Sequence, residues 1–283
     1  MPPTVLKVNG IGMMAEQGEV FAPVLHVATF KANQLESVID DINAAGFGLT
    51  FGLHTRIDDR VQRCVERLKV GNMYINRNQI GAVVGVQPFG GEGLSGTGPK
   101  AGGPMYLDGF YQPELNSVEA VEGSAASVDA VQKALDAIKP SDEAISVLEM
   151  PGPTGESNRL SQFARGKVLC LGPGAPAALQ QKLDVEKAGS VAVAVAPGLT
   201  SEQGVDGVLD ASALEKLLGI DVVVSWQGGE YAKACKRALA NRTGALVPLV
   251  VEKDLSRWSV RERHVCIDTT AAGGNASLLA GGV

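Results

Sequence analysis

The chain has 283 residues, of which 45% are hydrophobic and 20% charged, and its formal net charge is −6. This composition is typical of a soluble globular protein with room for two domains, and it offers no basic surface for nucleic acid. The sequence contains no apolar run of the ~18 residues that a membrane-spanning helix needs. Residues 1–12 lack the charged start and apolar core of a signal peptide, so we expect a cytoplasmic protein.

The cysteines and histidines are few and scattered. They are Cys64, Cys170, Cys235, Cys266, His26, His54 and His264. Because no two cysteines form a CxxC pair, neither a zinc site nor a disulfide framework is expected, and buried reduced thiols are the simplest interpretation. No serine or cysteine has an obvious base partner, so a hydrolytic triad has no support. We therefore predict no metal site and no catalytic residue among these side chains.

The first part of the chain alternates strand and helix patterns. Apolar and β-branched runs predict strands at 23–30, 48–55 and 72–77. Apolar residues at helical spacing predict two helices between them: Leu35, Val38, Ile39 and Ile42 in the first, and Val61, Cys64, Val65 and Leu68 in the second. This β–α–β–α–β order predicts an α/β layer with crossover helices.

A glycine-rich stretch, residues 81–104, follows the third predicted strand, and we call it the glycine loop. Nine of its residues are glycine and three are proline, which excludes a helix interior or a central strand. Its position after a strand is where ligands bind in open α/β sheets. Residues 91–96 fit the pattern G-x-G-x-x-G, but no helical pattern follows, which argues against a dinucleotide-binding loop.

The rest of the chain predicts a second unit. We assign residues 1–116 to the first layer, 117–150 to a linker with a helix near 128–138, 151–269 to a Rossmann-like accessory domain, and 270–283 to a tail. Residues 105–112 are expected to be extended. In the accessory domain, strands are predicted at 166–172, 190–196, 221–226, 245–252 and 264–270, with helices at 176–188, 211–218 and 230–242.

A possible nucleotide site lies in this second unit. Gly172, Pro173 and Gly174 stand between a predicted strand and a predicted helix, as in dinucleotide-binding folds. No acidic residue is clearly placed to hold a ribose, so Rossmann architecture without a cofactor is the favoured interpretation. An independent nucleotide-binding protein stays open as an alternative.

Three segments resemble the aldehyde dehydrogenase superfamily: EVFAPV (19–24), FGLHTRIDDRVQRCVERLKVGNMYINRN (51–78) and PFGGEGLSGTGPKAGGP (88–104). Residues 81–107 and the terminal CIDTTAAGGNASLLA are similar to the carboxyl-terminal part of the proline utilization A family. The resemblance covers nearly the whole chain. It implies an α/β fold, with a partial aldehyde dehydrogenase catalytic layer followed by a small doubly wound Rossmann-like domain. It also implies the NAD-dependent oxidation of glutamate γ-semialdehyde, which is in equilibrium with pyrroline-5-carboxylate, to glutamate.

The resemblance implies roles for five residues. Glu19 matches the glutamate that holds the nicotinamide ribose hydroxyls, and Phe21 matches the aromatic that packs against the nicotinamide. Gly81 and Ala82 match the backbone amides that anchor the substrate carboxylate, and Phe89 matches the aromatic that packs on the substrate's aliphatic chain. A glycine backbone lets an anion approach exposed N–H groups closely, which fits this anchor.

The chain departs from the family in one important respect. The family's nucleophilic cysteine, general-base glutamate, oxyanion asparagine and main NAD-binding fold all lie upstream of the matched segment. We therefore expect a catalytically incomplete fragment that binds NAD only together with the missing upstream part; FAD belongs to an absent proline dehydrogenase domain. Expected partners are a small-molecule substrate and either the missing N-terminal part of the same protein or a second copy, because a truncated layer leaves apolar surface bare. The alternative function is a non-catalytic lid or assembly module that complements a separate dehydrogenase polypeptide.

Overall fold

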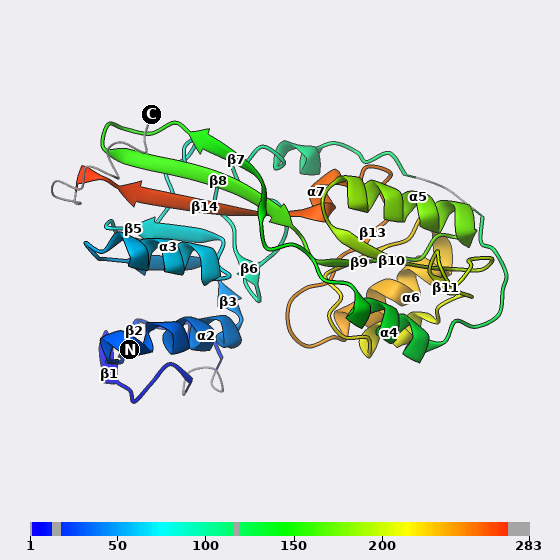
Figure 1. The fold of residues 1–283 in the computed structure, drawn as a ribbon, viewed down its shortest axis with the longest axis horizontal. Helices are drawn as coiled ribbons and strands as arrows, with labels where there is room; N and C mark the ends of the chain where they lie inside the picture. Colours follow the sequence, from blue (N-terminus) through cyan, green and yellow to red (C-terminus); the bar gives the residue numbers. More distant parts are fainter. Residues whose placement is uncertain (1, 13–17, 116–118, 271–283) are drawn as a thin grey trace.

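The computed structural model describes residues 2–12, 18–115 and 119–270 of the chain. Its two parts lie along the longest axis (Figure 1), with a layered sheet at one end and a compact α/β unit at the other. Of the expected tail, residues 270–283, only Thr270 lies within the described residues. Among those residues, no helix is both long enough and apolar enough to cross a membrane.

The first part is built mainly from the amino-terminal third of the chain. Its elements are β1 (Thr4–Lys7), β2 (Val24–Val27), η1 (Ala32–Gln34), α2 (Leu35–Ala45), β3 (Phe47–Gly48), β4 (Thr50–Leu53), α3 (Asp58–Arg67), β5 (Asn72–Ile75), β6 (Glu92–Gly93) and η2 (Leu107–Phe110). The three predicted strands and two predicted helices are therefore confirmed. Residues 105–112 are not extended as expected, because they form turns and the 3-10 helix η2.

Three later strands complete the sheet of the first part. They are β7 (Ala144–Met150), β8 (Glu156–Ala164) and β14 (Val260–Asp268), and the strand order is β4-β5-β14-β8-β7. β14 lies parallel to β5, with His264 opposite Asn72, and antiparallel to β8. The expectation that residues 264–270 belong to the Rossmann-like sheet is therefore wrong. The boundaries 117–150 and 151–269 likewise cut through this sheet, since β7 and β8 belong to it.

Helix α3 lies beside β5 (Figure 1), and Ile39 of α2 packs into the same apolar core on this face of the sheet. Their apolar faces, spaced at three and four residues, pack on alternate residues of β5 and β14. This core consists of Ile39, Val61, Cys64, Leu68, Val70, Met73, Ile75, Val265 and Ile267. Because strand side chains alternate between faces, the remaining residues of β5 and β14 point to the opposite face.

The second part is the Rossmann-like unit. Its elements are α4 (Val128–Ala137), β9 (Lys167–Cys170), α5 (Gly174–Lys187), β10 (Val191–Ala196), β11 (Val205–Asp206), η3 (Ala211–Glu215), β12 (Val222–Val224), α6 (Gly229–Ala240), β13 (Leu249–Val250) and α7 (Ser256–Ser259). All five strands run parallel in the order β11-β10-β9-β12-β13. The chain leaves β9 first to one side and then to the other, which is the doubly wound order that the sequence predicts.

Candidate functional site

The glycine loop covers the sheet face opposite α2 and α3. On this face β5 places Asn72 and Tyr74, and β14 places His264 and Cys266, by the alternation of strand side chains. Unlike the helix-covered face, this face is polar, and all four residues are buried. A loop rich in glycine can lie directly on such a face, because its backbone amides and carbonyls supply hydrogen-bond partners at close range.

Asn72 is the centre of the contact between strand and loop. Its Nδ2 donates to the carbonyl oxygen of Pro88 at 2.8 Å, and its Oδ1 accepts from the amide of Gly90 at 3.1 Å and from Nζ of Lys100 at 2.9 Å. The Lys100 ammonium also donates to the Gly90 carbonyl. Burial lowers the pKa of Lys100 to about 8, against the smaller opposing effect of Glu92 and Glu262. Asn72 thus ties two separate parts of the loop, residues 88–90 and Lys100, to β5.

A second attachment is ionic. Glu92 lies 3.0 Å from the Nη1 of Arg261 and 3.8 Å from the Nε of Arg263, both on β14. Glu262, between these arginines, accepts a hydrogen bond from the Lys100 amide at 3.1 Å. The loop is therefore fixed along its length to β14 as well as to β5.

The loop also approaches the sheet very closely at Gly71. A Cβ atom at this position would overlap the carbonyl oxygen of Gly90 and lie 2.8 Å from Nζ of Lys100. Only glycine leaves room for the loop backbone at this point.

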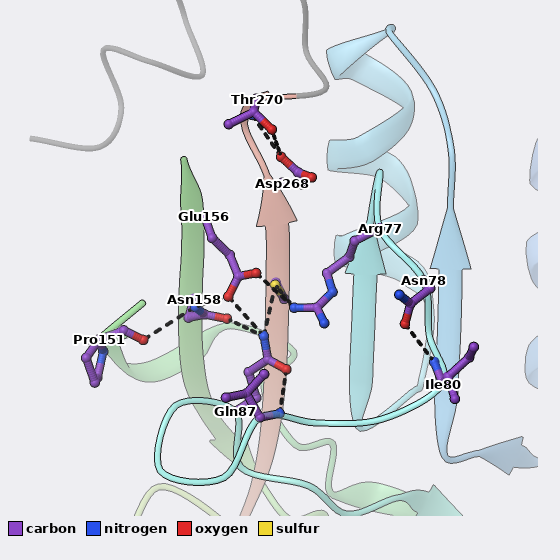
Figure 2. Close-up of polar contacts among 11 residues, drawn as sticks. Arg77, Asn78, Ile80, Gln87, Pro151, Glu156, Asn158, Asp268 and Thr270 are labelled. Carbon is purple, nitrogen blue, oxygen red and sulfur yellow. Dashed lines mark hydrogen bonds and ion pairs between the residues drawn. The ribbon is translucent and has the colours of Figure 1, made fainter. Parts of the chain in front are cut away.

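The start of the loop rests on a polar cluster formed by Arg77, Gln87, Glu156, Asn158 and Cys266 (Figure 2). Arg77 and Glu156 form an ion pair of 2.9 Å, and both side chains are more than four-fifths buried. The Arg77 guanidinium also donates to the Cys266 sulfur at 3.3 Å. The cluster joins the segment after β5 to β8 and β14, which the sequence assigned to another unit.

Gly81 and Ala82 lie just beyond this cluster. Gly81 is exposed and Ala82 half-buried, and a Cβ at Gly81 would meet no atom within 4 Å. Within the described part of the chain, no acceptor takes the amide hydrogen of either residue. Their N–H groups are free to bind an anion. Phe89 lies further along the loop, half-buried, and its backbone pairs with Ala101.

Glu19 and Phe21 lie elsewhere, on the chain before β2. Both are exposed, and Phe21 keeps 92% of its surface accessible. Among the described residues, neither Glu19 nor Phe21 has a hydrogen bond, an ion pair or a ring contact. The structure thus leaves both side chains available, and it does not bring them together with Gly81, Ala82 and Phe89.

The four cysteines are all free and buried. Desolvation raises the pKa of Cys64 and Cys170, and it raises the pKa of Cys235 and Cys266 to about 11. A thiol in this state does not supply the thiolate that attacks a carbonyl carbon. The described residues also contain no group of three or more His, Cys, Asp or Glu side chains that could hold a metal ion.

The candidate nucleotide site of the Rossmann-like unit is covered by the chain itself. Gly174, at φ +71°, would place a Cβ only 3.0 Å from Cγ2 of Val121. Residues 124–126 pair with Val208 next to β11 and hold this segment at the carboxyl ends of the strands. Val121 thus lies against the glycines where a pyrophosphate would bind, which argues against a nucleotide there.

Several residues that build this site were not singled out by sequence reasoning: Asn72, Gln87, Lys100, Glu156 and Glu262. A partial signal exists in β14, whose sequence VRERHVCID carries three charges in four residues, unlike the apolar strands of a covered parallel sheet. Because neighbouring strand residues point to opposite faces, these charges lie on both faces of β14, which argues against a place in the apolar Rossmann-like sheet.

The chain is similar to known proteins over nearly its whole length. Residues 1–115 match the Aldehyde dehydrogenase family. The chain is 38% identical to the bifunctional protein PutA of Rhizobium meliloti over 99% of its length, and it spans about a quarter of that relative. It is also 46% identical to the 1-pyrroline-5-carboxylate dehydrogenase of Bacillus subtilis, over 36% of this chain and 19% of that protein.

A solved structure of proline utilization A from Corynebacterium freiburgense shares the fold. The match has a TM-score of 0.55 and 22% identity, and it covers 88% of this chain and 25% of the other. The likeness thus extends from the amino-terminal layer into the Rossmann-like unit. The chain is therefore a relative of the bifunctional PutA proteins and matches about a quarter of their length, with a segment of the aldehyde dehydrogenase family in residues 1–115.

Proposed function

We propose that this chain is the substrate-anchoring part of an NAD-dependent L-glutamate γ-semialdehyde dehydrogenase of proline catabolism. The observation that carries the proposal is the pair of open amides at Gly81 and Ala82, on a loop that is otherwise fixed to the sheet. Two unpaired N–H groups on rigid backbone form a site for a carboxylate. The names of the relatives supply the substrate class, because they include a 1-pyrroline-5-carboxylate dehydrogenase.

Each proposed residue has a chemical role that its surroundings permit. The amides of Gly81 and Ala82 donate to the substrate carboxylate, and Phe89 provides an apolar wall for the methylene chain. Glu19 accepts hydrogen bonds from ribose hydroxyls, and the exposed ring of Phe21 packs on the nicotinamide. When bound, NAD accepts the hydride of the aldehyde; we expect it to bind only together with the part of the dehydrogenase that this chain lacks.

We also propose that this chain is catalytically incomplete. Aldehyde oxidation in this family proceeds through attack by a thiolate, and the four thiols of this chain are buried and protonated. A partner must therefore supply the nucleophile.

Exposed apolar surface supports the need for a partner. β1 and β2 form a two-stranded parallel sheet, although parallel sheets are normally covered on both faces. The exposed apolar side chains in or near this pair are Val5, Leu6, Val20, Phe21, Leu25, Val27 and Phe30. We propose that the upstream dehydrogenase part covers this surface, with a second copy of the chain as the alternative.

The test is an assay of NAD reduction with pyrroline-5-carboxylate. The chain is assayed alone and after mixing with a PutA polypeptide that carries the catalytic cysteine and ends where the similarity to this chain begins; we call this mixture the assembled enzyme. We expect activity only in the assembled enzyme. Robust turnover by the chain alone would overturn the claim of incompleteness, and an inactive mixture in which the two polypeptides bind each other would overturn the proposed function.

A non-catalytic assembly module is the second candidate. It is favoured by the insertion of β14 between β5 and β8, which makes the later part of the chain a support for the dehydrogenase strands. Under this alternative, removing residues 270–283 or the β7–β8 hairpin reduces the activity of a dehydrogenase that already has its own anchor loop. Unchanged kinetics after both deletions would exclude it.

A further inference from the structure

We propose that Gln87 is a positioning residue, which makes the carboxylate anchor at Gly81 and Ala82 depend on strands β8 and β14. The inference rests on the proposed function, since it concerns the same substrate anchor. Gln87 is 3% exposed although it lies in a loop, and both ends of its side-chain amide are hydrogen-bonded. None of its bonds goes to a proposed substrate-contacting residue, so its effect must be indirect.

The oxygen of the Gln87 side chain closes the turn that follows the anchor. Oε1 accepts a hydrogen bond from the amide of Val83 at 3.0 Å. The carbonyl oxygen of Val83 in turn accepts hydrogen bonds from the backbone amide of Gln87 at 2.9 Å and from that of Val86 at 3.2 Å. Backbone and side-chain hydrogen bonds between Val83 and Gln87 therefore close a turn over residues 83–87. This turn begins at the residue after Ala82.

The nitrogen of the same side chain reaches β8 and β14. Nε2 lies 3.1 Å from Oε1 of Glu156, 3.3 Å from Oδ1 of Asn158 and 3.3 Å from the Cys266 sulfur. The reversed amide orientation would direct its oxygen at the Glu156 carboxylate and leave the Val83 amide without an acceptor, so the contacts fix which end is nitrogen. Figure 2 shows the side chain between the loop and the two strands.

The acceptors of Gln87 are themselves held in place. Arg77 pairs with the second oxygen of Glu156 at 2.9 Å. Asn158 donates to the first oxygen at 2.9 Å and to the Pro151 carbonyl at 3.4 Å. These partners leave Gln87 one available position, so the strands determine where the turn at Val83 lies.

The two open amides stand between two such attachments. On the other side, the Ile80 amide donates to the side chain of Asn78 at 3.3 Å. The apolar side chains around the anchor, Ile80 and Val84, are 91% and 95% exposed and give it little packing support. Losing the Gln87 tether would free the anchor backbone, and the substrate would then bear the entropic cost of ordering it.

The kinetic consequence is specific. We expect Gln87→Leu in the assembled enzyme to raise the KM for pyrroline-5-carboxylate about tenfold, which corresponds to loss of one hydrogen-bonded tether. The kcat and the KM for NAD should stay within about twofold, because the reacting atoms and the ribose site lie elsewhere. Gln180→Leu is the matched control, since the side chain of Gln180 lies on the exposed surface of α5 and, among the described residues, hydrogen-bonds Asp184 alone.

A paired substitution tests the contact itself. Gln87→Glu opposes two carboxylates and should raise the KM as strongly as Gln87→Leu, and Glu156→Gln should raise it as well. In the double variant Gln87→Glu with Glu156→Gln, the new amide at position 156 can donate to the new carboxylate at position 87. Its KM should therefore return to within about threefold of the original value. A purely structural defect would not be rescued by the second substitution.

Amide hydrogen exchange on the chain alone separates this inference from the proposed function. Gln87→Leu should accelerate exchange of the Val83 amide about tenfold or more, whereas Gln180→Leu should leave it unchanged. Unaltered exchange at Val83 would overturn the positioning role whether or not the assembled enzyme is active. If the assembled enzyme is active, an unchanged KM or a fall in kcat alone for Gln87→Leu would also overturn the positioning role. If exchange at Val83 is accelerated but the assembled enzyme is inactive, the result counts against the proposed function and not against the positioning role.

Discussion

The ammonium nitrogen of Lys100 lies 2.9 Å from Oδ1 of Asn72, and both side chains are excluded from solvent beneath the glycine loop. The lysine therefore reaches back to the strand from which the loop departed. Because a buried cation is costly unless it is paired, the contact with Asn72 and the nearby Glu92 and Glu262 keeps the loop closed.

Asn72 is the first place to test this closure. Replacing Asn72→Leu should lower the free energy of unfolding by about 2 to 3 kcal/mol, because the Gly90 amide and the Pro88 carbonyl lose their side-chain partner and the Lys100 ammonium keeps only the Gly90 carbonyl among the described residues. Urea unfolding of the chain gives the measurement. Asn72→Asp is the control, since it keeps the acceptor for Lys100 and should cost less; equal losses in the two variants would contradict the role of the lysine.

His264 predicts a dependence of stability on pH. Burial, with smaller effects of Lys100 and Arg77, lowers the pKa of His264 from 6.5 to about 4. Below about pH 6.5 the unfolded chain binds a proton that the folded chain does not, so stability falls as the pH decreases towards 4, by about 3 kcal/mol in total. Above pH 6.5 the imidazole of His264 is neutral in both the folded and the unfolded chain, so this residue does not make the free energy of unfolding depend on pH.

The variant His264→Leu should remove that slope. Within the described residues, neither ring nitrogen of His264 has a hydrogen-bond partner, so the apolar substitution should cost little at pH 7. Urea midpoints measured at pH 7 and pH 5 for both proteins provide the comparison. A variant that loses as much stability between these pH values as the original chain would show that other groups cause the acid sensitivity.

Two glycines should respond oppositely to alanine. Gly71→Ala should destabilise the chain by about 2 kcal/mol or more, because its Cβ would overlap the Gly90 carbonyl oxygen. Gly81→Ala meets no atom within 4 Å and should change the urea midpoint little. In the assembled enzyme, however, Gly81→Ala should raise the KM for pyrroline-5-carboxylate, since a methyl group would crowd the approach of the carboxylate. An unaffected KM would remove Gly81 from the anchor.

The Rossmann-like unit should not bind NAD. Val121 lies against Gly174 at the carboxyl end of β9, in the place of a pyrophosphate. Calorimetric titration of the chain with NAD should therefore give no binding heat, whereas the assembled enzyme should bind it. Binding to the chain alone that disappears on Gly174→Val would restore the nucleotide-binding alternative.

Local patterns were sufficient for most helices and strands. The spacing of Val61, Cys64, Val65 and Leu68 predicted α3, and the apolar runs predicted β9, β10 and β12. They could not place β14, because strand pairing depends on contacts across almost two hundred residues. The apolar residues of β14 resemble those of a Rossmann-like strand, and only the charges at Arg261, Glu262 and Arg263 distinguish it.

Only part of the candidate site could be predicted, because some of its residues depend on partners that are distant in the sequence. Gly81, Ala82 and Phe89 came from resemblance, since a flexible glycine segment by itself does not specify a ligand. Gln87 carries no local signal, because its partners Glu156 and Asn158 lie 69 and 71 residues further along the chain. Side chains that act through distant partners become visible only when the fold brings them together.

The central position of β14 also constrains how the protein is made. Residues 260–268 occupy the gap between β5 and β8, so a nascent chain cannot close this sheet until these residues have left the ribosome. Until then, the apolar face of β5 and the edges of β5 and β8 stay open to other chains. We therefore expect shortened products that end before residue 260 to aggregate during synthesis, and expression at low temperature or with chaperones to favour the full-length protein.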